Sequence, residues 1–283
     1  MRTLSSRYIA GSELEDARQV VAQLNTDGKL ATVDVLGEEV VDETEAAAIA
    51  AEYVAALDVF ERYDLDANVS IKPTALGLKL GYDLCKRNVE AVIAAAEPTN
   101  RFVRIDMEDS STTDETLRLF RELRDEGHGR VGPVLQASLK RTVADAGTLA
   151  GASVRLCKGI YVEPESIQFR DDQAVRASFV QSLETLLDGD CYAAIATHDE
   201  WLVDQSLRLL RERDLPHDRY EFQMLLGVRS ELGDRLVADG HRLRIYVPYG
   251  RQWYEYSLRR LQENPKIAGY VAGDLGRSLL RRR

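Results

Sequence analysis

The sequence predicts an α/β fold, a distorted (β/α)8 TIM barrel, and three observations support this prediction. Short apolar runs rich in β-branched residues alternate with longer segments of helical period. Most of the runs are continuous rather than alternating, which is typical of parallel strands covered on both faces. Eight strand–helix units occupy about 230 residues, near the usual length of such a barrel. A doubly wound open sheet is the alternative architecture.

The predicted elements follow in order along the chain, beginning with an extra N-terminal helix over residues 13–25. The predicted strands are residues 30–36, 68–72, 102–107, 132–137, 153–158, 191–197, 220–225 and 244–248. The predicted helices are residues 43–61, 76–96, 114–126, 173–187, 200–213, 229–238 and 252–263. Cap residues begin the helix at 114, Gly127 ends it, and Pro216 stops the helix over 200–213.

The composition is that of one large domain, because 45% of the 283 residues are hydrophobic and 30% are charged. We expect a single domain over 1–283, with a helical extension at 1–28 and a tail at 265–283. The net charge of −10 argues against nucleic-acid binding. Three scattered cysteines and the absence of a signal peptide or membrane-length apolar run indicate a cytoplasmic protein. The basic C-terminal segment suggests peripheral contact with an anionic membrane, and a frayed, solvated tail is the favoured alternative.

Polar residues stand where the predicted strands end, and in a (β/α)8 barrel the chemistry lies at these ends. A gathering of polar side chains at one rim favours a site over unrelated helix caps. The residues concerned are Asp34, Lys72, Asp106, Glu108, Asp109, Gln136, Ser138, Arg155, Lys158, Thr197, His198, Asp199, Gln223 and Tyr246.

The adjacent Arg259 and Arg260, beside tyrosines and just after the last strand, suggest a pocket for a small carboxylic acid. A guanidinium binds a carboxylate through a planar two-point fork. A solvated basic helix face is the alternative. Lys72 is either a second carboxylate anchor or a Schiff-base nucleophile, and a lysine reaching into solvent is its third interpretation.

Three further strand ends carry candidates for chemistry. An acid near Asp106 is expected to pair with Lys72 or Arg155, and no histidine or acid at ligand spacing supports a metal there. Arg155 and Lys158 with a following glycine suit a phosphate or a reduced flavin, whereas no Rossmann or P-loop pattern occurs. His198 is a general base, a cofactor contact or a structural histidine.

Taken together, these strand ends resemble the proline dehydrogenase family. The matching segments are DVLGE at 34–38, VSIK at 69–72, VRLCKG at 154–159, ATH at 196–198, YEFQ at 220–223, RIY at 244–246, and RRL with EN at 259–264. They occur in family order and are jointly specific. The length resembles the monofunctional bacterial enzymes.

The resemblance implies a barrel that binds FAD non-covalently and oxidises L-proline to Δ1-pyrroline-5-carboxylate, with electrons passing to a membrane quinone. Transient contact with a pyrroline-5-carboxylate dehydrogenase is a further expectation. Asp106 would pair with Lys72 and keep it oriented, and Arg155 would lie near flavin N5. The implied substrate contacts are Lys72, Leu225, Tyr246, Tyr256, Arg259 and Arg260. The implied FAD contacts are Met107, Gln136, Arg155, Lys158, Gly159, Ile160, Thr197, His198 and Glu263.

Some positions depart from the family pattern, and two other functions compete. Ile160 stands where a small residue is common, Val162 where some relatives have an aromatic, and Leu226 where others have histidine. Tyr246 resembles the proline-specific branch, so hydroxyproline is expected to be a poor substrate.

The competing functions are a Schiff-base lyase using Lys72 or Lys158, and a barrel that senses an amino acid without turnover.

Overall fold

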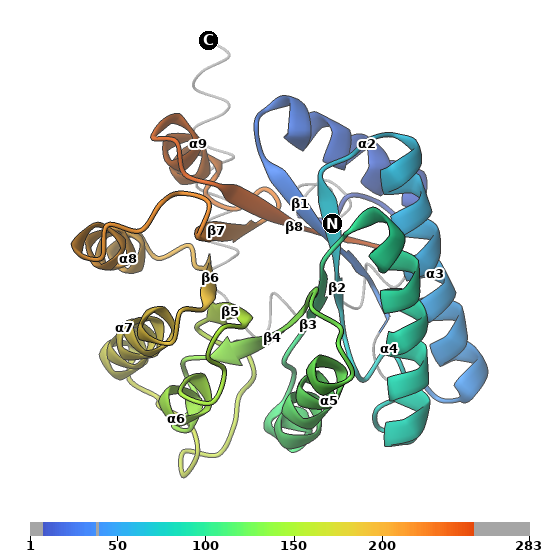
Figure 1. Ribbon diagram of the computed structural model, residues 1–283, viewed down its shortest axis with the longest axis horizontal. Coiled ribbons are helices and arrows are strands. Elements are labelled where there is room, and N and C mark those ends of the chain that lie inside the picture. Colours follow the sequence, from blue (N-terminus) through green and yellow to red (C-terminus); the bar gives the residue numbers. More distant parts are fainter. Residues whose placement is uncertain (1–7, 38–39, 252–283) are drawn as a thin grey trace.

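The protein is a closed barrel of eight parallel strands in the order β1 to β8, with β8 pairing back onto β1. The computed structural model describes residues 8–37 and 40–251 (Figure 1). The strands are β1 Leu30–Val35, β2 Ala67–Ile71, β3 Val103–Ile105, β4 Val131–Gln136, β5 Ser153–Cys157, β6 Tyr192–Ala196, β7 Tyr220–Leu225 and β8 Leu243–Tyr249. The predicted barrel is therefore confirmed.

Helices form a ring outside these strands (Figure 1). The helices are α2 Leu14–Thr26, α3 Glu43–Arg62, α4 Tyr82–Ala96, α5 Thr113–Asp125, α6 Thr142–Ala146, α7 Asp172–Asp188, α8 Glu200–Glu212 and α9 Ser230–Ala238, with 3-10 turns at Glu97–Thr99 and Ser110–Thr112. The extra helix α2 packs against β8 and β1. Within the described ranges, no helix has the length and apolar character required to cross a membrane.

The strands alternate between two environments, which corrects the expectation of continuous apolar strands. Val33, Val69 and Ile105 belong to the apolar core shared with the surrounding helices. Their chain neighbours Asp34, Ser70 and Arg104 are buried as well, but they are polar. Successive side chains of a strand point to opposite faces, so one face of β1, β2 and β3 packs on helices and the other lines a polar barrel interior.

A glycine makes room for one of these interior charges. Arg104 Nη1 donates to the carbonyl oxygens of Ser153 at 2.6 Å and Pro133 at 3.0 Å. A Cβ at Gly132 would lie 2.0 Å from the Ser153 oxygen and 2.8 Å from Arg104 Nη1. Any larger residue there would displace the guanidinium, so Gly132 is required by the packing of the interior rather than by a turn.

The predicted boundaries agree with the structure within two residues for every strand, and one helix is shorter than expected. The segment predicted as helix from 76 becomes helical only at Tyr82. Residues 73–80 form turns, and Gly77 adopts a φ of +97° that a helix does not allow. Helix α6 was not predicted, because five residues are too few to show a period. The predicted helix over 252–263 lies outside the described residues.

Candidate active site

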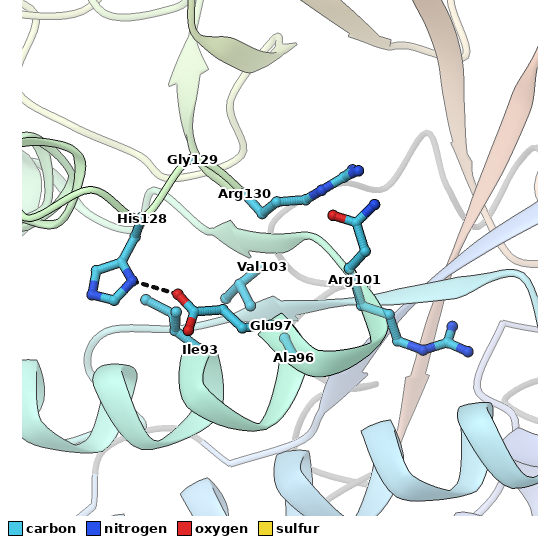
Figure 2. Close-up of a pocket in the computed structure, with 9 residues that line it drawn as sticks. Ile93, Ala96, Glu97, Arg101, Val103, His128, Gly129 and Arg130 are labelled. Carbon is cyan, nitrogen blue, oxygen red and sulfur yellow. Dashed lines mark hydrogen bonds and ion pairs between the residues drawn. The ribbon is translucent and has the colours of Figure 1, made fainter.

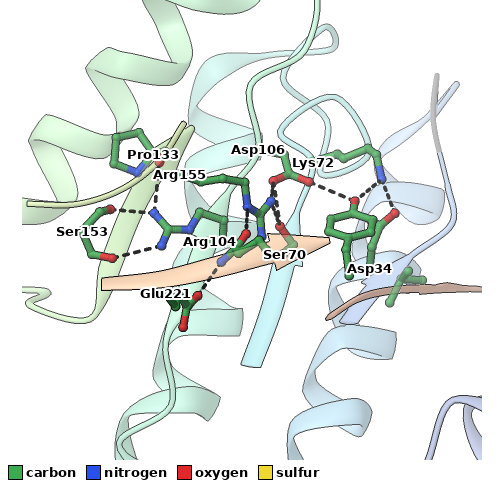
Figure 3. A network of polar contacts seen from close by, with 12 residues as sticks. Asp34, Ser70, Lys72, Arg104, Asp106, Pro133, Ser153, Arg155 and Glu221 are labelled. Carbon is green, nitrogen blue, oxygen red and sulfur yellow. Dashed lines mark hydrogen bonds and ion pairs between the residues drawn. The ribbon is translucent and has the colours of Figure 1, made fainter. Parts of the chain in front are cut away.

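Lys72 and Asp34 form a buried ion pair at the carboxyl ends of the adjacent strands β2 and β1 (Figure 3). Lys72 is 5% exposed and Asp34 is fully buried. Burial raises the pKa of Asp34 above its ordinary value, although the Lys72 charge opposes that shift. The carboxylate beside Lys72 is therefore Asp34, and the expectation that Asp106 pairs with Lys72 is wrong.

Asp106 instead pairs with Arg155, the other pairing that the sequence left open. Arg155 Nη1 lies 2.5 Å from Asp106 Oδ1, and Ser70 Oγ donates to the same oxygen at 2.7 Å. Tyr246 donates its hydroxyl to Asp106 Oδ2 at 3.1 Å. The same Tyr246 hydroxyl lies 3.5 Å from Lys72 Nζ, so the two ion pairs are joined into one network (Figure 3).

The reach of Arg155 across the barrel explains this choice of partners. It starts on β5, donates from Nε to Gln223 on β7 at 2.5 Å, and donates from Nη1 to Ser70 on β2 at 2.8 Å. Its guanidinium carbon lies 5.4 Å from the centre of the Tyr246 ring. Because hydrogen bonds to several strands fix the Arg155 guanidinium, it holds Asp106 at the rim.

One nitrogen of this guanidinium lacks a hydrogen-bond partner within the part of the chain that the structure describes. Arg155 Nη2 is a buried donor without an acceptor among the described residues. A buried donor without an acceptor costs about 1–3 kcal/mol. The residues present at the rim thus fit an additional group that supplies an acceptor, such as the ring of a flavin.

Lys158 is held beside the same rim by Asp199. Asp199 accepts from Lys158 Nζ and, through two bonds of 2.8 and 2.9 Å, from Arg176. Burial disfavours the charged carboxylate, but these hydrogen bonds outweigh it and lower the pKa of Asp199 to about 2. Asp199 also caps α8 by accepting from Trp201 N at 3.2 Å.

Gly159 allows the loop after β5 to lie against β4. It adopts a φ of +93°, and a Cβ there would lie 2.5 Å from Ser138 Oγ and 3.0 Å from Gln136 Oε1. Gln136 in turn donates from Nε2 to the Glu108 carbonyl at 2.8 Å. The loop therefore runs close over the end of the neighbouring strand, where the sequence placed a cofactor.

The remaining predicted contacts occupy the same rim in different ways. His198 Nε2 accepts a hydrogen bond from Leu225 N at 2.9 Å, which the tautomer with its proton on Nδ1 allows. The Nε2 lone pair is thereby occupied, so Nε2 does not serve as a general base. Thr197 is buried and accepts from Asp199 N at 3.1 Å. Of the other expected contacts, the FAD contact Met107 is buried, and the FAD contact Ile160 and the substrate contact Leu225 are half-buried. Tyr256, Arg259, Arg260 and Glu263 lie outside the described residues.

Sequence reasoning assigned no role to several members of this network. Asp34 and Gln223 were noted only as polar strand ends, and Ser70 and the buried pair of Glu221 with Arg244 were given no role. The missed signal is the alternation itself, because polar residues at every second position of a buried strand mark a polar interior.

One pocket of the described residues lies apart from this rim. A small pocket sits at the amino end of β3, where His128 Nδ1 lies 2.7 Å from Glu97 Oε1 (Figure 2). The amino end of a barrel contributes to stability rather than to catalysis. Across residues 8–37 and 40–251, no three His, Cys, Asp or Glu side chains gather in a way that suits a metal ion.

A closed parallel barrel with buried charges at the carboxyl ends of its strands defines a barrel enzyme. The sequence model described as proline dehydrogenase matches residues 17–272, and the chain belongs to this family. Proline dehydrogenase 1 of Bacillus subtilis subsp. natto is 35% identical over 267 residues, which cover 94% of this chain and 88% of that protein. Proline dehydrogenase of Deinococcus radiodurans is 35% identical over 277 residues, covering 96% and 89%.

Solved structures agree with this assignment. Proline utilization A from Bdellovibrio bacteriovorus, inactivated by N-propargylglycine, superposes with a TM-score of 0.86 at 25% identity. The match covers 93% of this chain and 33% of that one. The chain therefore corresponds to about a third of the length of that protein.

Proposed function

We propose that the protein oxidises L-proline to Δ1-pyrroline-5-carboxylate with non-covalently bound FAD. The observation that carries the proposal is the pair of joined ion pairs at the rim, in which Arg155 keeps one buried donor that finds no acceptor among residues 8–37 and 40–251. Family membership supports the substrate and the reaction. FAD when bound supplies a hydride acceptor, which proline oxidation requires.

The described side chains would divide the work between substrate and cofactor. Lys72 would attract the proline carboxylate, and Arg259 and Arg260 would complete the carboxylate site. Tyr246, Tyr256 and Leu225 would wall the ring. A substrate held at several points approaches the geometry of reaction before the bond breaks.

Apart from Glu263, which comes after β8 in the sequence, the cofactor contacts would lie at the carboxyl ends of β3 to β6. Gln136, Arg155 and Lys158 would supply hydrogen-bond donors, since their side chains reach the same strand ends. Gly159 would let the backbone approach closely. The remaining proposed FAD contacts are Met107, Ile160, Thr197, His198 and Glu263.

The reaction removes a hydride from C5 of proline and a proton from its nitrogen. We propose that the amine is already neutral when it reacts, its proton having passed to water, so that no strong base is needed at the rim. Loss of the C5 hydride then forms the C–N double bond. In kcat/KM, the pH profile should rise with the fraction of neutral amine, and a flat profile would contradict this proposal.

The acceptor of the electrons would be a quinone dissolved in a membrane. A protein that delivers electrons there would contact the membrane surface peripherally from the cytoplasm. The product would pass to a pyrroline-5-carboxylate dehydrogenase through transient contact. We also propose a single domain over 1–283, with an extension at 1–28 and a tail at 265–283, which the match over 17–272 supports.

The alternative functions fit the rim less well. A Schiff-base lysine must be neutral to attack a carbonyl, whereas Lys72 pairs with Asp34 and Lys158 pairs with Asp199. A sensor that only binds an amino acid would not require, beside the substrate site, a buried Arg155 donor that no described residue satisfies.

The decisive experiment is a visible spectrum of the purified protein before and after L-proline is added without oxygen. We expect the bands of oxidised flavin, and their bleaching by proline. Flavin bands that ignore proline would overturn the substrate. A protein that stays colourless after FAD is supplied would overturn the cofactor, and borohydride trapping of a carbonyl substrate on Lys72 would then favour the lyase.

A further inference from the structure

Tyr53 of α3 occupies a position between the carboxyl ends of β1 and β2. The two strands pair from Ala31 with Ala67 to Val33 with Val69, although both strands continue beyond that point. There the Tyr53 hydroxyl accepts from Val35 N at 3.2 Å on β1 and donates to the Ser70 carbonyl at 2.9 Å on β2. A side chain from the outer helix thus replaces the next contact between the strands.

The same hydroxyl contacts the carboxylate that holds Lys72. Tyr53 OH lies 3.2 Å from Asp34 Oδ1, and Asp34 Oδ2 pairs with Lys72 Nζ. Burial and the carboxylates of Asp34 and Asp106 raise the pKa of Tyr53 well above its ordinary value. Tyr53 therefore stays a phenol, and its single proton serves Asp34 Oδ1 and the Ser70 carbonyl.

We propose that Asp34 and Tyr53 are positioning residues that keep Lys72 protonated and directed at the carboxylate of the substrate. The inference rests on the proposed function. It is carried by the chain of contacts from Tyr53 through Asp34 to Lys72, all three of them at most 5% exposed.

The chemistry requires such a counter-ion. Burial favours the neutral amine of a lysine, and a neutral amine does not attract a carboxylate. Among residues 8–37 and 40–251, the groups that face this pair are Tyr53 from α3, Asp106 from β3 and Tyr246 from β8. Asp106 already neutralises Arg155, whereas Asp34 pairs directly with Lys72.

The proposal fixes the sign of two effects. In Asp34→Asn the ammonium loses its buried counter-charge, so a neutral amine forms as pH rises and KM for L-proline increases. The opposite sign would follow if Asp34 merely competed with the substrate for Lys72, because its removal would then lower KM. Tyr53→Phe keeps the ring and the Asp34 carboxylate but removes the hydroxyl that contacts Asp34, Val35 N and the Ser70 carbonyl. Because Asp34 keeps its charge, the effect on KM should have the same sign and be smaller.

The test measures kcat and KM for L-proline from pH 6 to 9 in the flavin-loaded wild type, Asp34→Asn and Tyr53→Phe. We expect KM to rise at least tenfold in Asp34→Asn and about threefold in Tyr53→Phe, increasingly at high pH, with kcat changed less. Tyr220→Phe is the matched control, because Tyr220 is equally buried but bonds His241 at the start of β7. Its kinetics should match the wild type.

Binding of two substrate fragments separates positioning from a general structural defect. Cyclopentanecarboxylate keeps the ring and the carboxylate, whereas pyrrolidine keeps the ring and the amine. Calorimetry should find that Tyr53→Phe and Asp34→Asn weaken the first ligand and leave the second unchanged. Should Asp34→Asn fail to fold, Tyr53→Phe alone carries the test.

Three outcomes would overturn the inference: a lower or unchanged KM in both variants, equal losses for the two fragments, or a KM change without pH dependence. A wild type that does not reduce its flavin with L-proline would instead overturn the proposed function. The two failures are therefore distinguishable.

Discussion

At the scale of single residues, the rim is built from charges that balance one another out of water. Two ion pairs lie there, Lys72 with Asp34 and Arg155 with Asp106. Each of the four side chains belongs to a residue that is at most 9% exposed. A buried charge without its partner costs about 3–5 kcal/mol. Each member therefore constrains the others, and replacing one alters the network rather than a single contact.

Tyr246 offers a residue-scale test of substrate choice. If its ring covers C4 of proline, the wild type should prefer L-proline over trans-4-hydroxy-L-proline by about 100-fold in kcat/KM, the size expected for an added hydroxyl in an apolar pocket. Tyr246→Ala should reduce this ratio about tenfold or more, while it also slows proline oxidation.

The matched variant Tyr246→Phe separates ring from hydroxyl. It removes the 3.1 Å bond to Asp106 but keeps the ring, so the preference for proline should survive. A preference lost in Tyr246→Phe would place discrimination in the hydroxyl and contradict the covering ring. Steady-state kinetics with both substrates make the comparison.

At the scale of elements, Asp199 joins the end of β5, helix α7 and the start of α8 through Lys158, Arg176 and Trp201. Because its folded pKa of about 2 lies below the ordinary 3.8, the carboxylate stabilises the fold above pH 4. This contribution is lost as pH falls from about 4 towards 2.

Asp199→Asn tests this linkage, since asparagine still caps a helix but carries no charge. We expect it to lower the free energy of unfolding at pH 7 by on the order of 1 kcal/mol, because Lys158 and Arg176 remain partly exposed and water screens the pair. Urea unfolding at pH 7, 5, 4 and 3 should show the difference from wild type shrinking below pH 4.

The control for that series is Asp188→Asn. Asp188 is 68% exposed and pairs with Arg213 at 2.8 Å, so the change should stay within about 0.5 kcal/mol. A difference for Asp199→Asn that stays constant down to pH 3 would mean that the carboxylate acts through packing and not through its charge.

How accurately the sequence predicts a strand depends on which interactions determine its first and last residues. Residues 220–225 were predicted to the residue, and turn backbone follows at Leu226 and Gly227. The strand expected over 102–107 pairs only from Val103 to Ile105, since Asp106 and Met107 already belong to the rim. Local pattern determines where a strand lies, whereas its last residues depend on what the neighbouring strands offer.

At the scale of the whole molecule, the sequence predicts which side chains meet but not which of them pair. Parallel strands of one barrel deliver their last residues to one rim, so Lys72, Asp106 and Arg155 were expected together. Which side chains form ion pairs depends on how far each one extends across the barrel, as Arg155 on β5 extends to Ser70 on β2. Sequence spacing carries no such distance, and for that reason Asp34 was not predicted as the partner of Lys72.

Binding of the cofactor should stabilise the whole barrel. A ligand that binds only the folded state at 100 times its Kd adds about 2.7 kcal/mol. Thermal unfolding of flavin-free protein should therefore shift upward by about 5 °C or more when FAD is added. The readout needs no turnover, and it tests the cofactor site even if the substrate assignment fails.

The same measurement assigns the contact residues when two lysines are compared. Lys158 lies at the rim beside Asp199, whereas Lys29 pairs with Asp234 just before β1, at the opposite end of the barrel. Lys158→Gln should shrink the FAD-induced shift, because an anionic cofactor loses a cation there, and Lys29→Gln should keep it whole. An undiminished shift in Lys158→Gln would remove Lys158 from the cofactor site and leave it as the partner that fixes Asp199 at the start of α8.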